Sequence, residues 1–172
     1  MSRHSADAAM TPRVRIQAEP FVLADEIASL RAGNRGVGAV VSFLGTVRDR
    51  NDGQGVVTLE LEHYPGMTEA AIDAMVDEAH ARFDILGARV VHRVGPMAPE
   101  EAIVAVVVTS AHRREAFQAC EFLMDYLKTQ APFWKKETLP DGSARWVDAR
   151  SADDEALQRW GIEARNAAGG AA

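Results

Sequence analysis

Residues 110–137 read SAHRREAFQACEFLMDYLKTQAPFWKKE, and this stretch organises our expectations for the fold. Its middle repeats apolar residues at spacings of three and four, the pattern of a helix that packs one face on a core. The repeating positions are Phe117, Cys120, Leu123, Met124 and Leu127. Pro132 ends this pattern, because proline cannot continue a helix. We therefore predict a long helix followed by a short strand, residues 133–138, that returns beside the end of the helix.

Basic residues lie at both ends of the predicted helix. Arg113 and Arg114 fall in its first turn, where the helix dipole makes each cation unfavourable by roughly 0.3–1 kcal/mol unless an anion binds there. At the other end, Lys128 and Lys135 are placed to share one pocket. Residues 112–136 hold five Lys or Arg against three acids, although the whole chain has a net charge of −6. This favours a small anionic substrate or an acidic tail over nucleic acid, and cations on a solvent-exposed helix face are the alternative.

Length and composition indicate one globular unit. With 172 residues, 47% hydrophobic and 26% charged, the chain is large enough for a single core and ordinary for a soluble domain. We expect a disordered tail at residues 1–12, one catalytic domain at 13–165 and a frayed end at 166–172. The start of the chain lacks the apolar run of a secretory signal, and no stretch is long and apolar enough to span a membrane. The expected location is the cytoplasm, without membrane contact.

Cys120 is the single cysteine, which excludes an internal disulfide and a four-cysteine zinc site. Its place on the apolar face of the helix favours a small buried side chain. A persulfide carrier is the alternative, but it would need an exposed thiol with a lowered pKa. The sequence contains no phosphate-binding glycine loop and no zinc-protease motif, so we expect no metal and no other cofactor.

The remaining apolar patterns predict an α+β domain with mixed or antiparallel sheets. Further strands are expected at residues 13–17, 37–44, 56–63, 88–94, 102–109 and 144–147, and further helices at 25–32, 68–83 and 151–164. The apolar runs 37–44 and 102–109 are typical of central strands. Residues 49–55 have the composition of a mobile loop, and Thr68 is expected to cap the second helix.

Four motifs in this order resemble the large, catalytic subunit of molybdopterin synthase. They are FLGTVR at 43–48, LEHYPGM at 61–67, TSAHR at 109–113 and MDYLKTQAPFWKK at 124–136. The similarity covers about residues 37–150. It implies an α/β hammerhead-like fold with an additional antiparallel sheet.

The resemblance also implies a function, partners and site residues. The enzyme would convert cyclic pyranopterin monophosphate (precursor Z) into molybdopterin, taking sulfur from the C-terminal thiocarboxylate of a small ubiquitin-like subunit. A homodimeric core, and with the small subunits a heterotetramer, is implied. The catalytic residues would be Lys128 and Lys135, the substrate-binding residues Arg48, His112, Arg113 and Arg150, and the pocket wall Phe43 and Met124.

Two other readings of the basic segment stay open. One is a non-catalytic adaptor that docks a ubiquitin-like tail. The other is a lyase that forms a Schiff base through Lys128.

Overall fold

The computed structural model describes residues 11–147 and 151–162. Its main sheet has four strands in the order β1 (Val14–Gln17), β6 (Gly87–Arg93), β8 (Ala102–Ser110) and β2 (Ala39–Thr46). Strand β1 runs parallel to β6, and the other two pairings are antiparallel. Strand β8 is buried almost along its whole length, as expected for an apolar strand that has neighbours on both sides.

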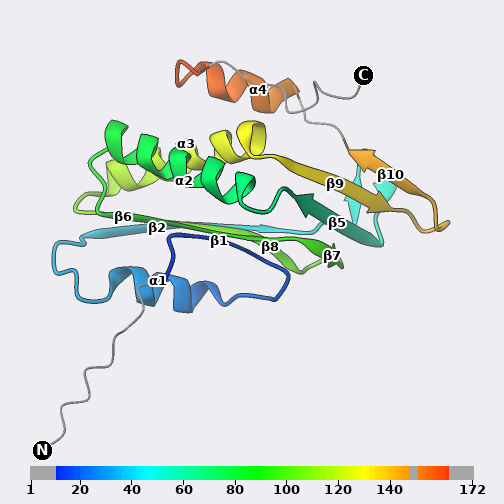
Figure 1. Cartoon of the computed structure of the whole chain (residues 1–172), viewed down its shortest axis with the longest axis horizontal. Coiled ribbons are helices and arrows are strands. Elements are labelled where there is room, and N and C mark those ends of the chain that lie inside the picture. The colour runs from blue at the N-terminus through cyan, green and yellow to red at the C-terminus, as the bar shows by residue number, and fades with distance from the viewer. Residues whose placement is uncertain (1–10, 148–150, 163–172) are drawn as a thin grey trace, which may run out of the picture.

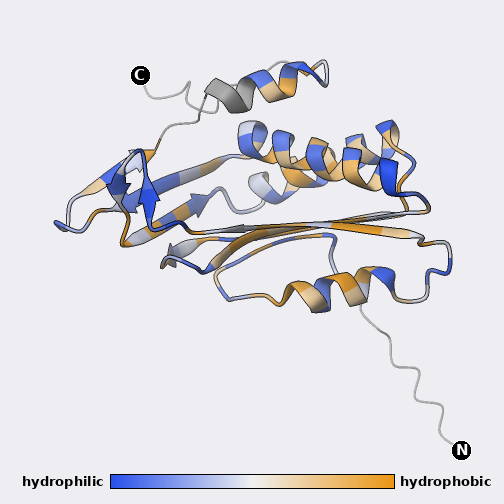
Figure 2. Ribbon diagram, turned by 180° about the vertical axis from the view of Figure 1, so that it is seen from behind, coloured by the Kyte–Doolittle hydropathy of each residue, from blue (hydrophilic) through white to orange (hydrophobic). Residues whose placement is uncertain are grey.

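Helices cover both faces of the main sheet (Figure 1). Helices α2 (Met67–Arg82) and α3 (Arg113–Gln130) lie side by side on one face, and α1 (Leu23–Arg31) lies on the other. The apolar residues gather on the sheet and on the helix surfaces that face it (Figure 2). The main core joins Ile72, Met75 and Val76 of α2 to Phe122 and Leu123 of α3. From the sheet it includes Val90 of β6 and Val104, Val106 and Val108 of β8.

A second, antiparallel sheet extends from one end of the molecule (Figure 1). Its strands follow the order β10 (Ala144–Val147), β9 (Phe133–Thr138), β5 (Thr58–His63) and β7 (Gly95–Met97). Val47, Leu59, Leu61 and Met97 form a small core under this sheet. Ile103 and Phe133 pack against both this cluster and the main core, so the two sheets share a continuous interior.

The last described helix, α4 (Ser151–Gln158), is followed by a segment that packs on α2 and α3. Leu157 is fully buried, and the Trp160 ring meets Phe83 and Phe122 edge to face. The indole Nε1 of Trp160 donates a hydrogen bond of 2.7 Å to Asp125 of α3. Both apolar and polar contacts therefore fix this segment to the helical layer.

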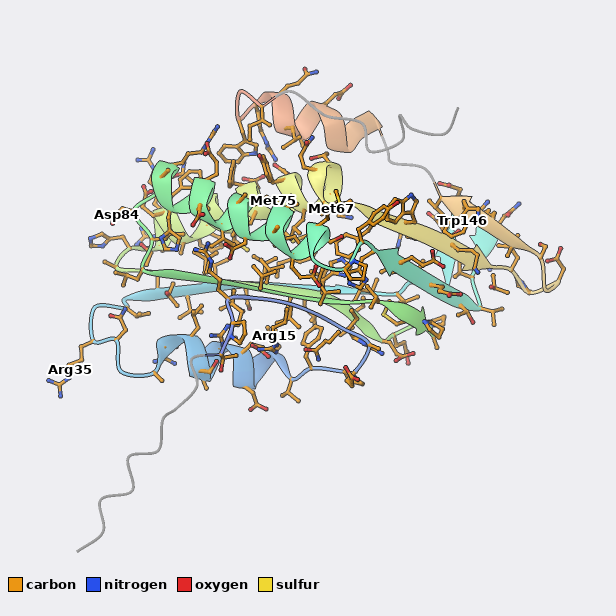
Figure 3. All side chains as sticks on the ribbon, in the orientation of Figure 1. Arg15, Arg35, Met67, Met75, Asp84 and Trp146 are labelled. Atoms are coloured by element: carbon orange, nitrogen blue, oxygen red, sulfur yellow. The ribbon has the colours of Figure 1, made fainter. Side chains whose placement is uncertain are left out.

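The face of the main sheet under α1 contains buried charges. Glu26 of α1 is 7% exposed and pairs with Arg15 of β1 and with Arg89 of β6, which is 6% exposed. Figure 3 places Arg15 on this side of the sheet, while Trp146 lies at the far end of the molecule on the second sheet. Glu26 is thus the carboxylate shared by two arginines beneath the sheet.

The predicted α+β class and the additional antiparallel sheet are confirmed. Within residues 11–147 and 151–162, no helix combines the length and apolar character needed to cross a bilayer. The final helix ends at Gln158 rather than near residue 164.

Four local predictions were wrong. Strand β2 is an edge strand, not a central one, and Phe43 and Leu44 on it are exposed. Phe117 lies outside the buried face of α3 and is 61% exposed, because Ala116 and Ala119 occupy the positions that face the sheet. The expected loop at 49–55 contains a short hairpin, β3 (Arg50–Asn51) and β4 (Gln54–Gly55). Helix α2 is capped by Gly66, with φ of +84°, and not by Thr68.

Candidate active site

A pocket of about 140 Å³ opens where the main sheet, the second sheet and the end of α3 meet. Its apolar lining comes from Val47, Val56, Leu59 and Ile103. Its polar lining consists of Thr46, Arg48, Arg50, Asn51, Lys128, Lys135 and Glu137. Four cations therefore surround a space large enough for a small part of a substrate, and three of them are residues that the sequence motifs singled out.

Lys128 and Lys135 reach the pocket because α3 turns directly into β9. Lys128 occupies the last turn of α3, where the negative end of the helix dipole stabilises a cation. Ala131 ends the helix, and the Phe133 amide closes a tight turn by donating to the Ala131 carbonyl at 2.9 Å. Strand β9 then points Phe133, Lys135 and Glu137 toward one face by its two-residue period. One turn thus brings two lysines, seven positions apart, into a common site.

The LEHYPGM motif supports this turn from outside the pocket. The buried hydroxyl of Thr68 accepts a hydrogen bond from the Tyr64 amide at 3.0 Å and donates to the Pro132 carbonyl at 3.1 Å. The left-handed conformation of Gly66 starts α2 beside this contact, and its amide donates to Glu69 at 2.6 Å. Thr68, directly after the motif, therefore holds the start of α2 against the turn that separates the two lysines.

Arg48 follows β2 and enters the pocket next to the β3–β4 hairpin. Sequence reasoning selected Arg48 but missed Arg50, Asn51 and Glu137, which line the same pocket. The missed signal is Asp52-Gly53 between the two short strands. Both residues have positive φ, 51° and 78°, as a two-residue hairpin turn requires. An Asp-Gly pair was thus the available evidence for a hairpin in place of a mobile loop.

The charged residues of the pocket are of two kinds: a buried carboxylate that is already hydrogen-bonded within the protein, and cations that are not buried. Glu137 is only 3% exposed, and its oxygens accept hydrogen bonds from Asn51 and Arg145. Arg48, Arg50 and Lys128 are exposed, so their donors can reach a ligand. Such a pocket can hold a phosphate or carboxylate through charge-assisted hydrogen bonds, and a lysine in it can deliver a proton to a leaving group.

His112 and Arg113 lie at the opposite end of α3 from this pocket. His112 is the residue before the first turn, Arg113 opens the helix, and both are exposed. Lys128 lies fifteen positions after Arg113, which corresponds to about 22 Å along the helix. One small substrate cannot touch both ends within a single chain.

Phe43 and Met124 do not line this pocket of their own chain. Phe43 is 38% exposed on the edge strand β2. Met124 is half-buried against the main core. Arg150 lies outside the described residues. The roles of these three residues remain predictions.

Cys120 is buried in the main core and carries a free thiol. Burial raises the pKa of this thiol to about 11, so it is protonated at neutral pH. A protonated, enclosed thiol is a poor nucleophile. The geometry therefore favours the packing role over the persulfide carrier.

Comparisons with known proteins agree on one family. The family model described as MoaE protein matches residues 16–130. The molybdopterin synthase catalytic subunit of Ralstonia nicotianae is 60% identical over 156 residues, covering 91% of this chain and 88% of that protein. The protein of the same name from Escherichia coli K12 is 49% identical over 148 residues, covering 86% and 97%.

Solved structures give the same result. The molybdopterin biosynthesis MoaE protein of Burkholderia ambifaria superposes with a TM-score of 0.76 at 54% identity, covering 89% of this chain and all of that one. The molybdopterin synthase of Staphylococcus aureus superposes with a TM-score of 0.74 at 30% identity, covering 80% and 98%. The chain therefore belongs to the MoaE protein family of molybdopterin synthase catalytic subunits.

Proposed function

We propose that this chain transfers sulfur from the C-terminal thiocarboxylate of a small ubiquitin-like subunit to cyclic pyranopterin monophosphate, forming the dithiolene of molybdopterin. The observation that carries the proposal is the convergence of Arg48, Lys128 and Lys135 on one pocket. Family membership supports the reaction class, a sulfurtransferase of molybdenum cofactor biosynthesis.

The reaction needs two anions to meet, and the pocket offers cations for both. Arg48, with its planar fork of donors, is suited to the substrate phosphate, and the lysines are suited to the thiocarboxylate. Two thiocarboxylates are used in turn. Each sulfur forms a bond to one carbon of the substrate as a C–O bond at that carbon breaks and its oxygen takes up a proton, and water then cleaves the bond between sulfur and the acyl carbon. The small subunit leaves as a carboxylate. Lys128 is assigned the proton transfers that open the cyclic phosphate, and Lys135 stabilises the negative charge beside it.

A second copy of this chain completes the proposed site. The distance along α3 keeps His112 and Arg113 from their own Lys128, whereas a two-fold axis can bring them to the Lys128 of a partner copy. The exposed Phe43 and Leu44 on the edge strand β2 offer an apolar surface for such a contact. With one small subunit bound to each copy, the assembly is a heterotetramer. A solved complex of subunits 1 and 2 of the Helicobacter pylori molybdopterin-converting factor has the same fold. We assign the cytoplasm as the location.

Reconstitution tests the function directly. The purified chain is mixed with the thiocarboxylated small subunit and precursor Z, and dithiolene formation is followed. We expect product with the wild type and none with Lys128→Ala, whose exposed side chain can be removed without loss of the fold.

The same experiment separates the alternatives. Product formation by a folded Lys128→Ala variant would favour a docking adaptor. Covalent trapping of Lys128 by borohydride in the presence of a carbonyl substrate would favour a lyase.

A further inference from the structure

Asn51 is the buried residue of a hairpin whose other side chains face solvent. It is 6% exposed, while Arg50, Asp52 and Gln54 on the same hairpin are exposed. Burying a primary amide is unfavourable unless its donors and acceptors are used. The contacts of Asn51 therefore explain why the hairpin places it inward.

These contacts join the β3–β4 hairpin to strands β9 and β10, which lie 86 and 94 residues further along the chain at the points of contact. The Asn51 amide nitrogen donates to Glu137 Oε1 on β9 at 2.7 Å. The other oxygen of Glu137 accepts from Nε and Nη2 of Arg145 on β10, at 3.1 and 3.0 Å. Arg145 Nη2 also donates to the main-chain carbonyl of Asn51 at 3.1 Å. The three residues close a ring of hydrogen bonds that attaches the hairpin to the second sheet.

The chemistry of the ring fixes the orientation of the Asn51 amide. An ionised carboxylate can only accept hydrogen bonds, so the NH₂ group of Asn51 must face Glu137. Its oxygen Oδ1 then faces the opposite way, toward Arg48 Nη2, 3.5 Å away. This distance is the outer limit of a hydrogen bond, so the contact is weak and involves one of the five N–H donors of Arg48.

Glu137 connects the contacts of Asn51 to strand β9, which also carries Lys135. Glu137 and Lys135 are two residues apart on β9 and therefore point to the same face, and both line the pocket. Glu137 also pairs across the strands with Arg145. The carboxylate that orients Asn51 is thus part of the strand that delivers Lys135.

We propose that Asn51, held by Glu137 and Arg145, is a positioning residue that sets the Arg48 guanidinium for binding the anionic group of the substrate. This inference rests on the proposed function and extends it to residues that no motif identified. Arg48 remains the binding residue, and Asn51 acts through it.

Steady-state kinetics of the reconstituted enzyme test the inference. Asn51→Ala is expected to raise the KM for cyclic pyranopterin monophosphate about tenfold while kcat stays within about twofold, because a ground-state contact is lost. Asn51→Asp keeps the size but cannot donate to Glu137, and we expect a KM at least as high. Arg145→Lys, whose ammonium cannot supply the same fork of donors, should give a smaller increase.

Gln54→Ala is the matched control on the same hairpin. It removes the exposed bond from Arg145 Nη1, 3.0 Å, and leaves the contacts of Asn51 in place. Its KM should equal that of the wild type. An increase as large as that of Asn51→Ala would overturn the inference, because any disturbance of the hairpin would then suffice.

A double-mutant cycle separates positioning from general stability. In an Arg48→Ala background, Asn51→Ala should change KM by less than about twofold, since the residue it orients is gone. Independent, multiplying effects would overturn the inference, as would a wild-type KM in Asn51→Ala.

The same four proteins can be compared without turnover. The affinity of each chain alone for inorganic phosphate is measured by NMR through the arginine Nε–H resonances. Absence of product with the wild type would count against the proposed function. If Asn51→Ala weakens phosphate binding by the same factor with and without Arg48, the positioning role is wrong.

Discussion

The imidazole of His92 on β6 stacks on the ring of Phe133 on β9, with ring centroids 4.0 Å apart and planes inclined by 20°. Its Nδ1 lies 2.8 Å from the Arg93 carbonyl, a contact in which the ring nitrogen donates. The stack joins the main sheet to the second sheet at the start of the strand that carries Lys135. Burial, with smaller contributions from His63 and Lys128, lowers the pKa of His92 to about 4.

This pKa predicts a loss of stability in mild acid. Well above pH 6.5 His92 is neutral in both the folded and the unfolded chain, so its titration does not lower the stability. As the pH falls from 6.5 to 4, the unfolded chain binds a proton that the folded chain does not, and the free energy of unfolding falls by up to about 3 kcal/mol. His92→Phe should make this fall shallower. Urea unfolding at a series of pH values measures it, and identical slopes in both proteins would refute the assignment.

Lys135 and Lys136 provide a matched pair on adjacent positions of β9. Lys135 lines the pocket, whereas Lys136 lies on the opposite face, 3.3 Å from Glu60 and over the ring of Trp146. We expect Lys135→Ala to lower kcat about 100-fold or more, in the range for loss of one preorganised charge at an active site. Lys136→Ala should keep kcat within about twofold. Equal losses in the two variants would mean that overall charge, not the pocket, governs turnover.

Subunit exchange tests the site shared between two copies. An Arg113→Ala chain is mixed with a Lys128→Ala chain, each inactive alone. Random exchange makes half of the dimers mixed, and each mixed dimer keeps one intact site, so about one quarter of wild-type activity should return. Verified exchange without any recovery would show that each site is built within one chain.

Cys120→Ala should leave the rate of sulfur transfer unchanged. The thiol is buried in the main core and protonated at neutral pH, so it has no access to the sulfur donor. Removal of the sulfur atom should lower the free energy of unfolding by about 1 kcal/mol through lost burial. Kinetics and thermal unfolding of the same preparation check both parts. A stable variant that has lost turnover would reopen the persulfide route.

Glu26→Ala should be among the more destabilising single changes on the α1 side of the sheet. It leaves Arg15 and the buried Arg89 without their shared carboxylate, and breaking a buried ion pair from one side costs about 3–5 kcal/mol. Asp25→Ala, an exposed acid in the same helix turn, is the control and should cost about 1 kcal/mol or less. Chemical denaturation compares the two, and similar losses would contradict the role of the buried pair.

The sequence predicted which segments form helices and strands better than it predicted where each lies in the sheets and which of its residues are buried. Hydrophobic periodicity located β6 and β8, because both strands are largely buried. The strands predicted at 133–138 and 144–147 correspond to β9 and β10. Periodicity misplaced β2, since an apolar strand at the edge of a sheet has the same sequence pattern as one at its centre. Phe117 was misassigned for the same reason, as helical spacing cannot distinguish a core face from an exposed apolar one.

The candidate site was only partly predictable. Lys128 and Lys135 could be predicted to share a pocket because a helix, a proline and a strand follow one another in the sequence. Asn51 and Glu137 were not, since their importance arises from a contact across 86 residues. Neither residue belongs to a local pattern, and only the folded chain shows that they meet.

Strand β2 has a further consequence for the life of the chain before assembly. Between Ala39 and Thr46 it carries neither a charged residue nor a proline, the usual protections of an exposed strand edge, and it displays Phe43 and Leu44 to solvent. Such an edge is a template for pairing with any extended peptide. An isolated copy is therefore vulnerable to aggregation through this strand. Ser42→Lys would protect the isolated chain and would weaken the proposed contact between two copies, so solubility and assembly would oppose each other at this strand.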